Sequence, residues 1–184
     1  QNLPNIEITC HSEHLEFSER IGSKVYEALG NNRVLGESLY LSTLFPERRE
    51  AVRAAFGPLA VGALRASPEY LGIAENRWES AFDRFHEELT VHLEEVAASL
   101  ARSADVVGIT TSLAQTFSSL SLARQIKLRS PAVKIVLGGA SVQAGSGLSV
   151  VREFAFVDYV IQGEGEEPLG LMLRAILENR NLDP

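Results

Sequence analysis

The sequence has a single cysteine, Cys10, among its 184 residues. One cysteine excludes an internal disulfide framework, and it excludes a zinc or iron–sulfur site built from a cysteine cluster of this chain alone. Basic residues are also few, because 17 Lys and Arg stand against 24 Asp and Glu, for a formal net charge of -7. This balance argues against nucleic acid or an anionic membrane as the main partner, since both require a concentrated basic face.

Long apolar runs are absent as well. No run approaches the roughly 20 residues that cross a bilayer, and no charged-then-apolar leader opens the sequence. We therefore predict no membrane partner and a cytoplasmic location. The sequence begins at Gln1 and enters the strand-like "NIEITC" almost at once, so we expect a fragment of a longer protein. Its hydrophobic content of 45% suffices for one α/β domain with a helical subdomain.

The first hundred residues are predicted to be mostly helical. Residues 5–10 alternate in the manner of a strand, and apolar residues at helical spacing then predict a helix over 12–30. Two short helices are expected over 33–45 and 46–56. A long helix is expected from Ser67, as its N-cap, to about Arg102, with one apolar stripe along its later part. The middle of the chain therefore lacks strands.

From Asp105 onward, predicted strands and helices alternate regularly. The strands are "DVVGITTS", "VKIVLGG" and "DYVIQGEGE", and predicted helices of about 10 to 14 residues separate them, which is typical of right-handed crossovers in a parallel sheet. The predicted fold is α/β, a doubly wound, Rossmann-like or flavodoxin-like open parallel sheet with an all-helical insert. We divide it into 1–30 (first visible strand and helix), 31–102 (helical insert) and 103–184 (remainder of the α/β domain).

The three predicted strands end in small, polar or glycine-rich residues, in "ITTSLAQ", "LGGAS" and "QGEGEE". Ligands of open α/β sheets bind at the carboxyl ends of the strands. Gly138 and Gly139 admit two interpretations, a tight turn with positive φ or a close approach of ligand to the backbone. We favour a platform on which one flat ligand lies across all three strand ends. A nucleotide is the competing ligand, although neither G-x-G-x-x-G nor the Walker lysine pattern occurs.

Two long segments resemble a known family. "VVGITTSLAQTFSSLSLARQIKLRSPAVKIVLGGASVQAGSG" and "FAFVDYVIQGEGEEPL" resemble the cobalamin-binding domain of B12-dependent radical S-adenosylmethionine (SAM) enzymes. The resemblance is closest to the group that modifies ribosomally made peptides (RiPP maturation), often as C-methyltransferases. "LEFSERIGSKVYEAL" and "LGESLYLSTLFP" resemble the helical segments of the same group, so the resemblance spans roughly residues 5 to 180. It implies a protein that binds vitamin B12.

The resemblance also implies which residues hold the corrin ring at the strand ends. Carried over to this sequence, the cofactor-binding residues are Thr110, Thr111, Ser112, Leu113, Gln115, Gly138, Gly139, Ala140, Gly163, Glu164 and Gly165. The Asp-x-His-x-x-Gly motif of other cobalamin domains is missing, so no histidine is predicted on cobalt. The C-x-x-x-C-x-x-C triplet is also missing. SAM, its [4Fe–4S] cluster and the peptide substrate are therefore expected to bind to a radical SAM domain outside this sequence.

We predict neither catalytic residues nor metal ligands within the sequence. Glu164 and Glu166 could form an acid–base pair, but Glu166 fits better in the first turn of the last helix, where the helix dipole favours it. His92 lies by the apolar stripe and is predicted to pack there, whereas His86 is predicted to be solvated. The alternative functions are a nucleotide-binding domain and a non-catalytic α/β interaction or regulatory module.

Overall fold

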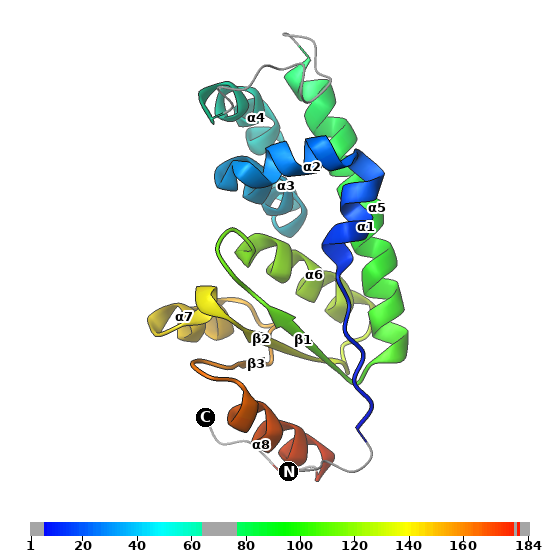
Figure 1. Ribbon diagram of the computed structural model, residues 1–184, viewed down its shortest axis with the longest axis vertical. Coiled ribbons are helices and arrows are strands. Elements are labelled where there is room, and N and C mark those ends of the chain that lie inside the picture. The colour runs from blue at the N-terminus through cyan, green and yellow to red at the C-terminus, as the bar shows by residue number, and fades with distance from the viewer. Residues whose placement is uncertain (1–5, 64–76, 179, 181–184) are drawn as a thin grey trace.

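The computed structural model describes residues 6–63, 77–178 and 180 of the chain. A group of short helices lies above a small parallel sheet, and the long helix α5 (Trp78–Ser103) runs beside both parts (Figure 1). No described helix is long and apolar enough to cross a membrane.

The helices that precede the sheet in the chain are α1 (Glu13–Ile21), α2 (Ser23–Asn31), α3 (Arg33–Leu44), η1 (Pro46–Arg48), α4 (Arg49–Ala63) and α5. From here on, the insert denotes all of these helices, α1 to α5, and so covers more of the chain than the predicted insert over 31–102. The elements of the sheet region follow. They are β1 (Val106–Thr110), α6 (Thr116–Arg129), β2 (Lys134–Gly138), η3 (Ala140–Val142), α7 (Gly145–Glu153), β3 (Tyr159–Val160) and α8 (Glu166–Leu177).

The three strands form a parallel sheet in the order β1-β2-β3. Val107 lies opposite Ile135, and Leu137 lies opposite Val160. The central strand β2 has three consecutive buried residues, which is typical of a strand covered on both faces. Helices α6 and α8 lie on opposite sides of the sheet (Figure 1). These findings confirm the predicted α/β fold with an open parallel sheet.

Two hydrophobic cores meet along α5. The insert core contains the aromatic residues Phe17, Phe56, Phe82 and Phe85 together with leucines of α2, α3 and α5. The sheet core is mainly aliphatic and includes buried residues of α5, α6, β1 and β2. Because α5 contributes Phe82 to the first core and Leu100 to the second, it fixes the position of the insert relative to the sheet.

The predicted strand at Ile6–Cys10 is wrong, because these residues carry no regular secondary structure. A strand requires a neighbour that exchanges backbone hydrogen bonds with it. Within the described ranges, β1 pairs with β2 only and Ile8 is 76% exposed, so this segment lacks both a partner strand and a core to face.

Two helix boundaries also differ from the prediction. The helix predicted over 12–30 is broken at Gly22, whose φ of +90° separates α1 from α2. The helix predicted over 46–56 continues as α4 through Pro58. The predicted start of the long helix at Ser67 lies outside the described residues.

Candidate functional site

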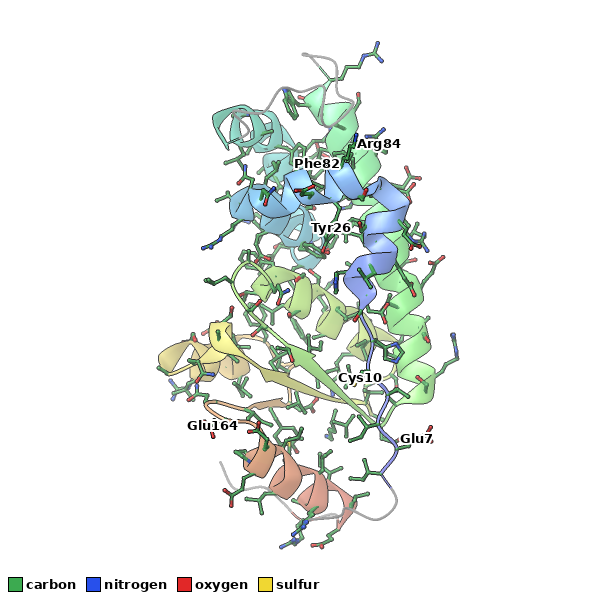
Figure 2. All side chains as sticks on the ribbon, viewed as in Figure 1. Glu7, Cys10, Tyr26, Phe82, Arg84 and Glu164 are labelled. Atoms are coloured by element: carbon green, nitrogen blue, oxygen red, sulfur yellow. The ribbon has the colours of Figure 1, made fainter. Side chains whose placement is uncertain are left out.

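The carboxyl ends of the three strands lie along one edge of the sheet. Thr110, the last residue of β1, is in register with Gly138, the last residue of β2, and β3 ends one pair earlier, at Val160 opposite Leu137. Three loops leave this edge, toward α6, η3 and α8. Figure 2 shows Glu164, in the loop before α8, on the opposite side of the molecule from Cys10.

Hydrogen bonds hold the first two strand ends together. The backbone N–H and the hydroxyl of Thr111 both donate to the carbonyl oxygen of Gly138, at 2.7 and 2.9 Å. Ser141, after β2, also binds the loop after β1. Its N–H donates to the Thr111 carbonyl at 3.3 Å, and its hydroxyl donates to the Ser112 carbonyl at 2.5 Å. The loops after β1 and β2 therefore form one unit.

This close contact explains one of the two adjacent glycines. Gly139 has a φ of +101°, and a Cβ atom placed there would lie 2.2 Å from the Thr111 carbonyl oxygen. The turn interpretation therefore holds for Gly139, which is required by the backbone itself. Gly138 differs. The atom nearest to a Cβ added at Gly138 would be the Ile161 carbonyl oxygen, at 3.9 Å, so space remains beside this residue.

Gln143 joins the third strand end to the other two. Its amide nitrogen Nε2 donates to the Gly139 carbonyl at 3.0 Å, and its oxygen Oε1 accepts from the Gly163 N–H at 2.8 Å. Gln162 donates in turn to the Ala144 carbonyl at 2.5 Å. The sequence analysis did not identify Gln143, whose only signal is a long amide side chain within a run of small residues.

The predicted cofactor-binding residues differ in their exposure. Those on the surface of this edge are Thr110, Ser112, Leu113, Gln115, Ala140, Gly163 and Glu164. Gly138, Gly139 and Gly165 are half-buried. Thr111 is 1% exposed, and its hydroxyl is engaged by Gly138, so it can support the edge but not contact a ligand directly. We call the exposed and half-buried residues the strand-end shelf.

The loop that leads into α6 is closed by its own side chains. Gln115 Oε1 accepts hydrogen bonds from the backbone N–H and the hydroxyl of Ser112, at 3.0 and 2.7 Å. Ala114 takes a left-handed φ of +62°. As a result, Leu113 stands out at the tip of the loop with 70% of its surface exposed.

Carboxylates lie at two of the three helix N-termini along this edge. Glu37 of α3 reaches the first turn of α6, where its Oε2 accepts from the Phe117 N–H at 2.9 Å. Helix α8 begins with Glu166 and Glu167, whereas the first turn of α7 has no acidic residue. A carboxylate favoured by the helix dipole occupies the position that a phosphate group would take. The shelf is therefore poorly suited to a polyphosphate.

Glu37 was not identified from the sequence. Burial raises the pKa of its carboxyl group, and the hydrogen bond from the Phe117 backbone opposes that shift. Its other oxygen, Oε1, is buried and has no hydrogen-bond partner in the described part of the structure.

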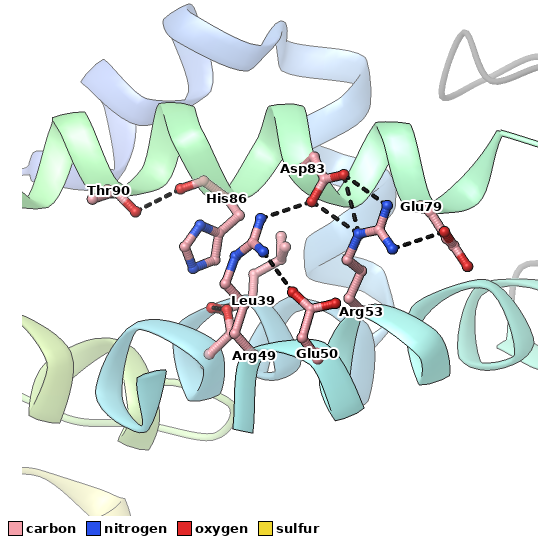
Figure 3. Close-up of polar contacts among 9 residues, drawn as sticks. Leu39, Arg49, Glu50, Arg53, Glu79, Asp83, His86 and Thr90 are labelled. Carbon is pink, nitrogen blue, oxygen red and sulfur yellow. Dashed lines mark hydrogen bonds and ion pairs between the residues drawn. The ribbon is translucent and has the colours of Figure 1, made fainter. Parts of the chain in front are cut away.

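The two histidines of α5 belong to the insert rather than to the shelf. His92 is 4% exposed and stacks on Phe17 with ring centroids 5.4 Å apart, which confirms its predicted packing role. The prediction that His86 is solvated is wrong, because it is half-buried with its ring 5.6 Å from that of Phe82, on the side of α5 that faces Arg49 (Figure 3). Desolvation is the main cause that lowers the pKa of both histidines.

The strand-end shelf is a largely exposed surface on which Gly138 and Gly163 carry no side chain. A Cβ added at Gly163 would meet nothing within 4 Å, one added at Gly138 would meet only the Ile161 carbonyl oxygen at 3.9 Å, and hydrogen bonds fix the loops around these positions. Among the described residues, no group of three or more His, Cys, Asp and Glu side chains could hold a metal ion.

Comparison with known proteins identifies the family. A family model described as the B12 binding domain matches residues 75–173, which is more than half of the chain. No curated protein and no solved structure matches the chain. The matched residues include α5 and all three strand ends of the shelf. The chain therefore belongs to the B12 binding domain family, and this membership supports cobalamin as its ligand.

Proposed function

We propose that this chain is the cobalamin-binding domain of a B12-dependent radical SAM enzyme that modifies a peptide, with C-methylation as its reaction. The observation that carries the cobalamin part is the strand-end shelf lying within the residues that match the B12 binding domain. The radical SAM part rests on the resemblance of the strand-end segments and of the helical segments over 15–29 and 35–46 to that group, and these helical segments lie outside the match.

Each group of shelf residues has a distinct task in this proposal. Ser112, Leu113 and Gln115 contact one side of the corrin, and Gly163 and Glu164 contact the opposite side. Gly138 and Ala140, which have little or no side chain, leave room for the corrin between these two groups of contact residues. Thr111, Gly139 and Gln143 hold the three loops at fixed spacing, so the shelf is formed before the ligand arrives. Such preorganisation lowers the entropic cost of binding.

The chain itself has a binding role. Methylcobalamin, when bound, supplies a transferable methyl group to the reaction. The chain's residues orient the corrin and shield one of its faces from water, which is the usual contribution of a protein to cofactor chemistry. SAM and the [4Fe–4S] cluster are proposed to bind in a radical SAM domain of the parent protein, which also receives the peptide.

Reconstitution tests the cobalamin part. The purified chain is incubated with hydroxocobalamin and desalted, and the retained cofactor is measured by its visible absorbance. We expect wild type to retain it and Ala140→Trp to lose it, because an indole at this exposed shelf position would occupy the surface proposed to hold the corrin. Ala132→Trp is the matched control, since Ala132 is also exposed but precedes β2 at the opposite edge of the sheet. Equal retention by both variants contradicts the proposal.

A nucleotide ligand would give a different pattern. Thermal stabilisation by a nucleotide, without stabilisation by cobalamin, would assign the chain to nucleotide binding instead. The carboxylates at the N-termini of α6 and α8 argue against that outcome. The radical SAM part is tested on the parent protein purified without oxygen, for which we expect bound iron and reductive cleavage of SAM.

A further inference from the structure

A groove of about 960 Å³ opens beside the strand-end shelf. Helices α3 and α4 form most of its wall through apolar residues such as Leu41, Val52 and Leu59, and Phe45 lies in the wall just after α3. Ala114 and Phe117 complete the wall from the loop after β1 and the start of α6. The groove and the shelf are therefore adjacent, because Ala114 directly follows the exposed Leu113.

The groove wall contains a few charged residues, two of them acidic and two basic. Glu37 lies in the wall, and its buried Oε1 is an acceptor without a donor among the described residues. Arg33 and Arg48 lie in the wall as exposed residues that form no ion pair with any described residue, and Glu47 is the other charged residue there. An occupant should therefore be largely apolar and carry both N–H donors and carbonyl acceptors.

The position of Glu37 is fixed independently of any ligand. Its Oε2 accepts the Phe117 N–H at 2.9 Å, and this contact ties α3 to the first turn of α6. Two further hydrogen bonds support the same junction, because the Ser121 hydroxyl accepts from Thr43 at 2.9 Å and donates to the Tyr40 carbonyl at 3.0 Å. The unsatisfied Oε1 is thus held in place, and a buried unpaired oxygen is costly until it receives a donor.

The α4 wall of the groove is attached to α5 by ion pairs. Arg49 and Arg53 of α4 both bind Asp83, with contacts at 2.7 and 3.0 Å, and Arg53 also pairs with Glu79 at 2.8 Å (Figure 3). The α4 wall is also packed on α5, because the ring of Phe56 lies 5.4 Å from that of Phe82. One wall is thus attached to α6 and the other to α5, so the groove is a fixed feature of the fold.

We infer that the groove receives the amide-bearing rim of the corrin, with Glu37 Oε1 accepting a hydrogen bond from a corrin carboxamide. This inference rests on the proposed cobalamin function. The rim of a corrin carries methyl groups and primary carboxamides in alternation, which matches an apolar wall with one buried acceptor. The exposed guanidinium groups of Arg33 and Arg48 can donate to the carboxamide carbonyls. The insert thereby becomes part of the cofactor site, although most of the groove lies outside the residues that match the family.

Two substitutions test this assignment by equilibrium titration with hydroxocobalamin and with cobinamide, which keeps the corrin amides but lacks the nucleotide tail. Ala55→Trp fills the groove from an exposed wall position, and Ala54→Trp places the same side chain on an exposed α4 position outside the groove. We expect Ala55→Trp to weaken both ligands at least about tenfold and Ala54→Trp to change neither. Circular dichroism confirms that the variants are folded.

Glu37→Gln is the second variant and decides the result if Ala55→Trp fails to fold. Glutamine keeps an oxygen that can accept the Phe117 N–H, but it replaces the charged acceptor in the groove with a neutral amide. A charge-assisted hydrogen bond to the ligand is then lost, so the affinity for both ligands should fall about tenfold. Wild-type affinity in folded Ala55→Trp or in Glu37→Gln, with Ala140→Trp still impaired, would overturn this inference and leave the proposed function intact. Failure of wild type to retain hydroxocobalamin would overturn both.

Discussion

The sheet region and the helical insert are built on different principles. In the sheet region, hydrogen bonds between side chains and backbone, together with a tightly packed glycine, bring three loops together at the strand ends. In the insert, aromatic residues fill a core and salt bridges join the helices. The two regions share α5, and α3 also packs on α6. The contrast indicates that the shelf provides a surface, while the insert provides a wall with specific polar groups.

The largest expected effect tests whether the two cores form one cooperative unit. Phe56→Ala in the insert core and Ile135→Ala in the sheet core each remove a fully buried side chain. They should lower the free energy of unfolding by about 3–5 and 2–5 kcal/mol respectively. Because α5 belongs to both cores, chemical denaturation followed by circular dichroism should show one transition in each variant. Two separate transitions would show that the insert and the sheet unfold independently.

The next effect compares two glycines of the shelf that both have positive φ. Gly139→Ala should cost about 2 kcal/mol or more, since the added Cβ meets the Thr111 carbonyl in addition to the unfavourable φ of +101°. Gly163→Ala should cost only about 1 kcal/mol, because nothing lies within 4 Å of its added Cβ. Thermal denaturation of the two variants measures the difference, and equal losses would contradict the close packing assigned to Gly139.

A smaller, pH-dependent effect is expected at the junction of insert and sheet. Burial raises the pKa of Glu37 above its ordinary value, so the folded state holds this proton more tightly than the unfolded state. Wild type therefore loses stability as the pH rises from the ordinary pKa of the carboxyl through its raised value. Glu37→Gln lacks this loss and should gain stability relative to wild type over that range. If wild type instead gained stability relative to Glu37→Gln as the pH rises, the Glu37 carboxyl group would not have a raised pKa.

The smallest effect is expected for the salt bridges of the insert. Asp83→Asn removes the carboxylate that Arg49 and Arg53 share, but these side chains are 27–38% exposed. Partly exposed pairs contribute little and are screened by salt. The difference in melting temperature from wild type should therefore be small at low ionic strength and vanish at about 1 M salt, where the Debye length is about 3 Å. A large, salt-independent loss would mean that the cluster determines the fold of the insert.

The sequence predicted the sheet region better than the insert. Regular alternation of buried strands and helices from Asp105 onward depends on local patterns, and the structure confirms those strands. The strand predicted at Ile6–Cys10 failed because a strand also depends on a neighbour, which a local pattern does not reveal. The break at Gly22 was missed because a glycine is tolerated in many helices.

In the candidate site, too, local sequence patterns did not reveal contacts between residues that are distant in the chain. Glycine-rich strand ends identified the shelf, because parallel strands bring their carboxyl ends to one edge. Gln143 and Glu37 could not be found in this way, since their importance comes from contacts with residues 20 and 80 positions away in the chain. His86 was misassigned for a related reason. Its helical position placed it beside glutamates, whereas the packing of α4 on α5 covers it.

Hydrogen–deuterium exchange with and without hydroxocobalamin tests the central claim most directly. Bound corrin should slow amide exchange in the three shelf loops, at residues 111–115, 139–146 and 161–165. Exchange at the opposite edge of the sheet, around residues 131–134, should stay unchanged. Protection confined to that opposite edge, or no protection at the shelf with cobalamin bound, would contradict the assignment of the shelf as the cobalamin site.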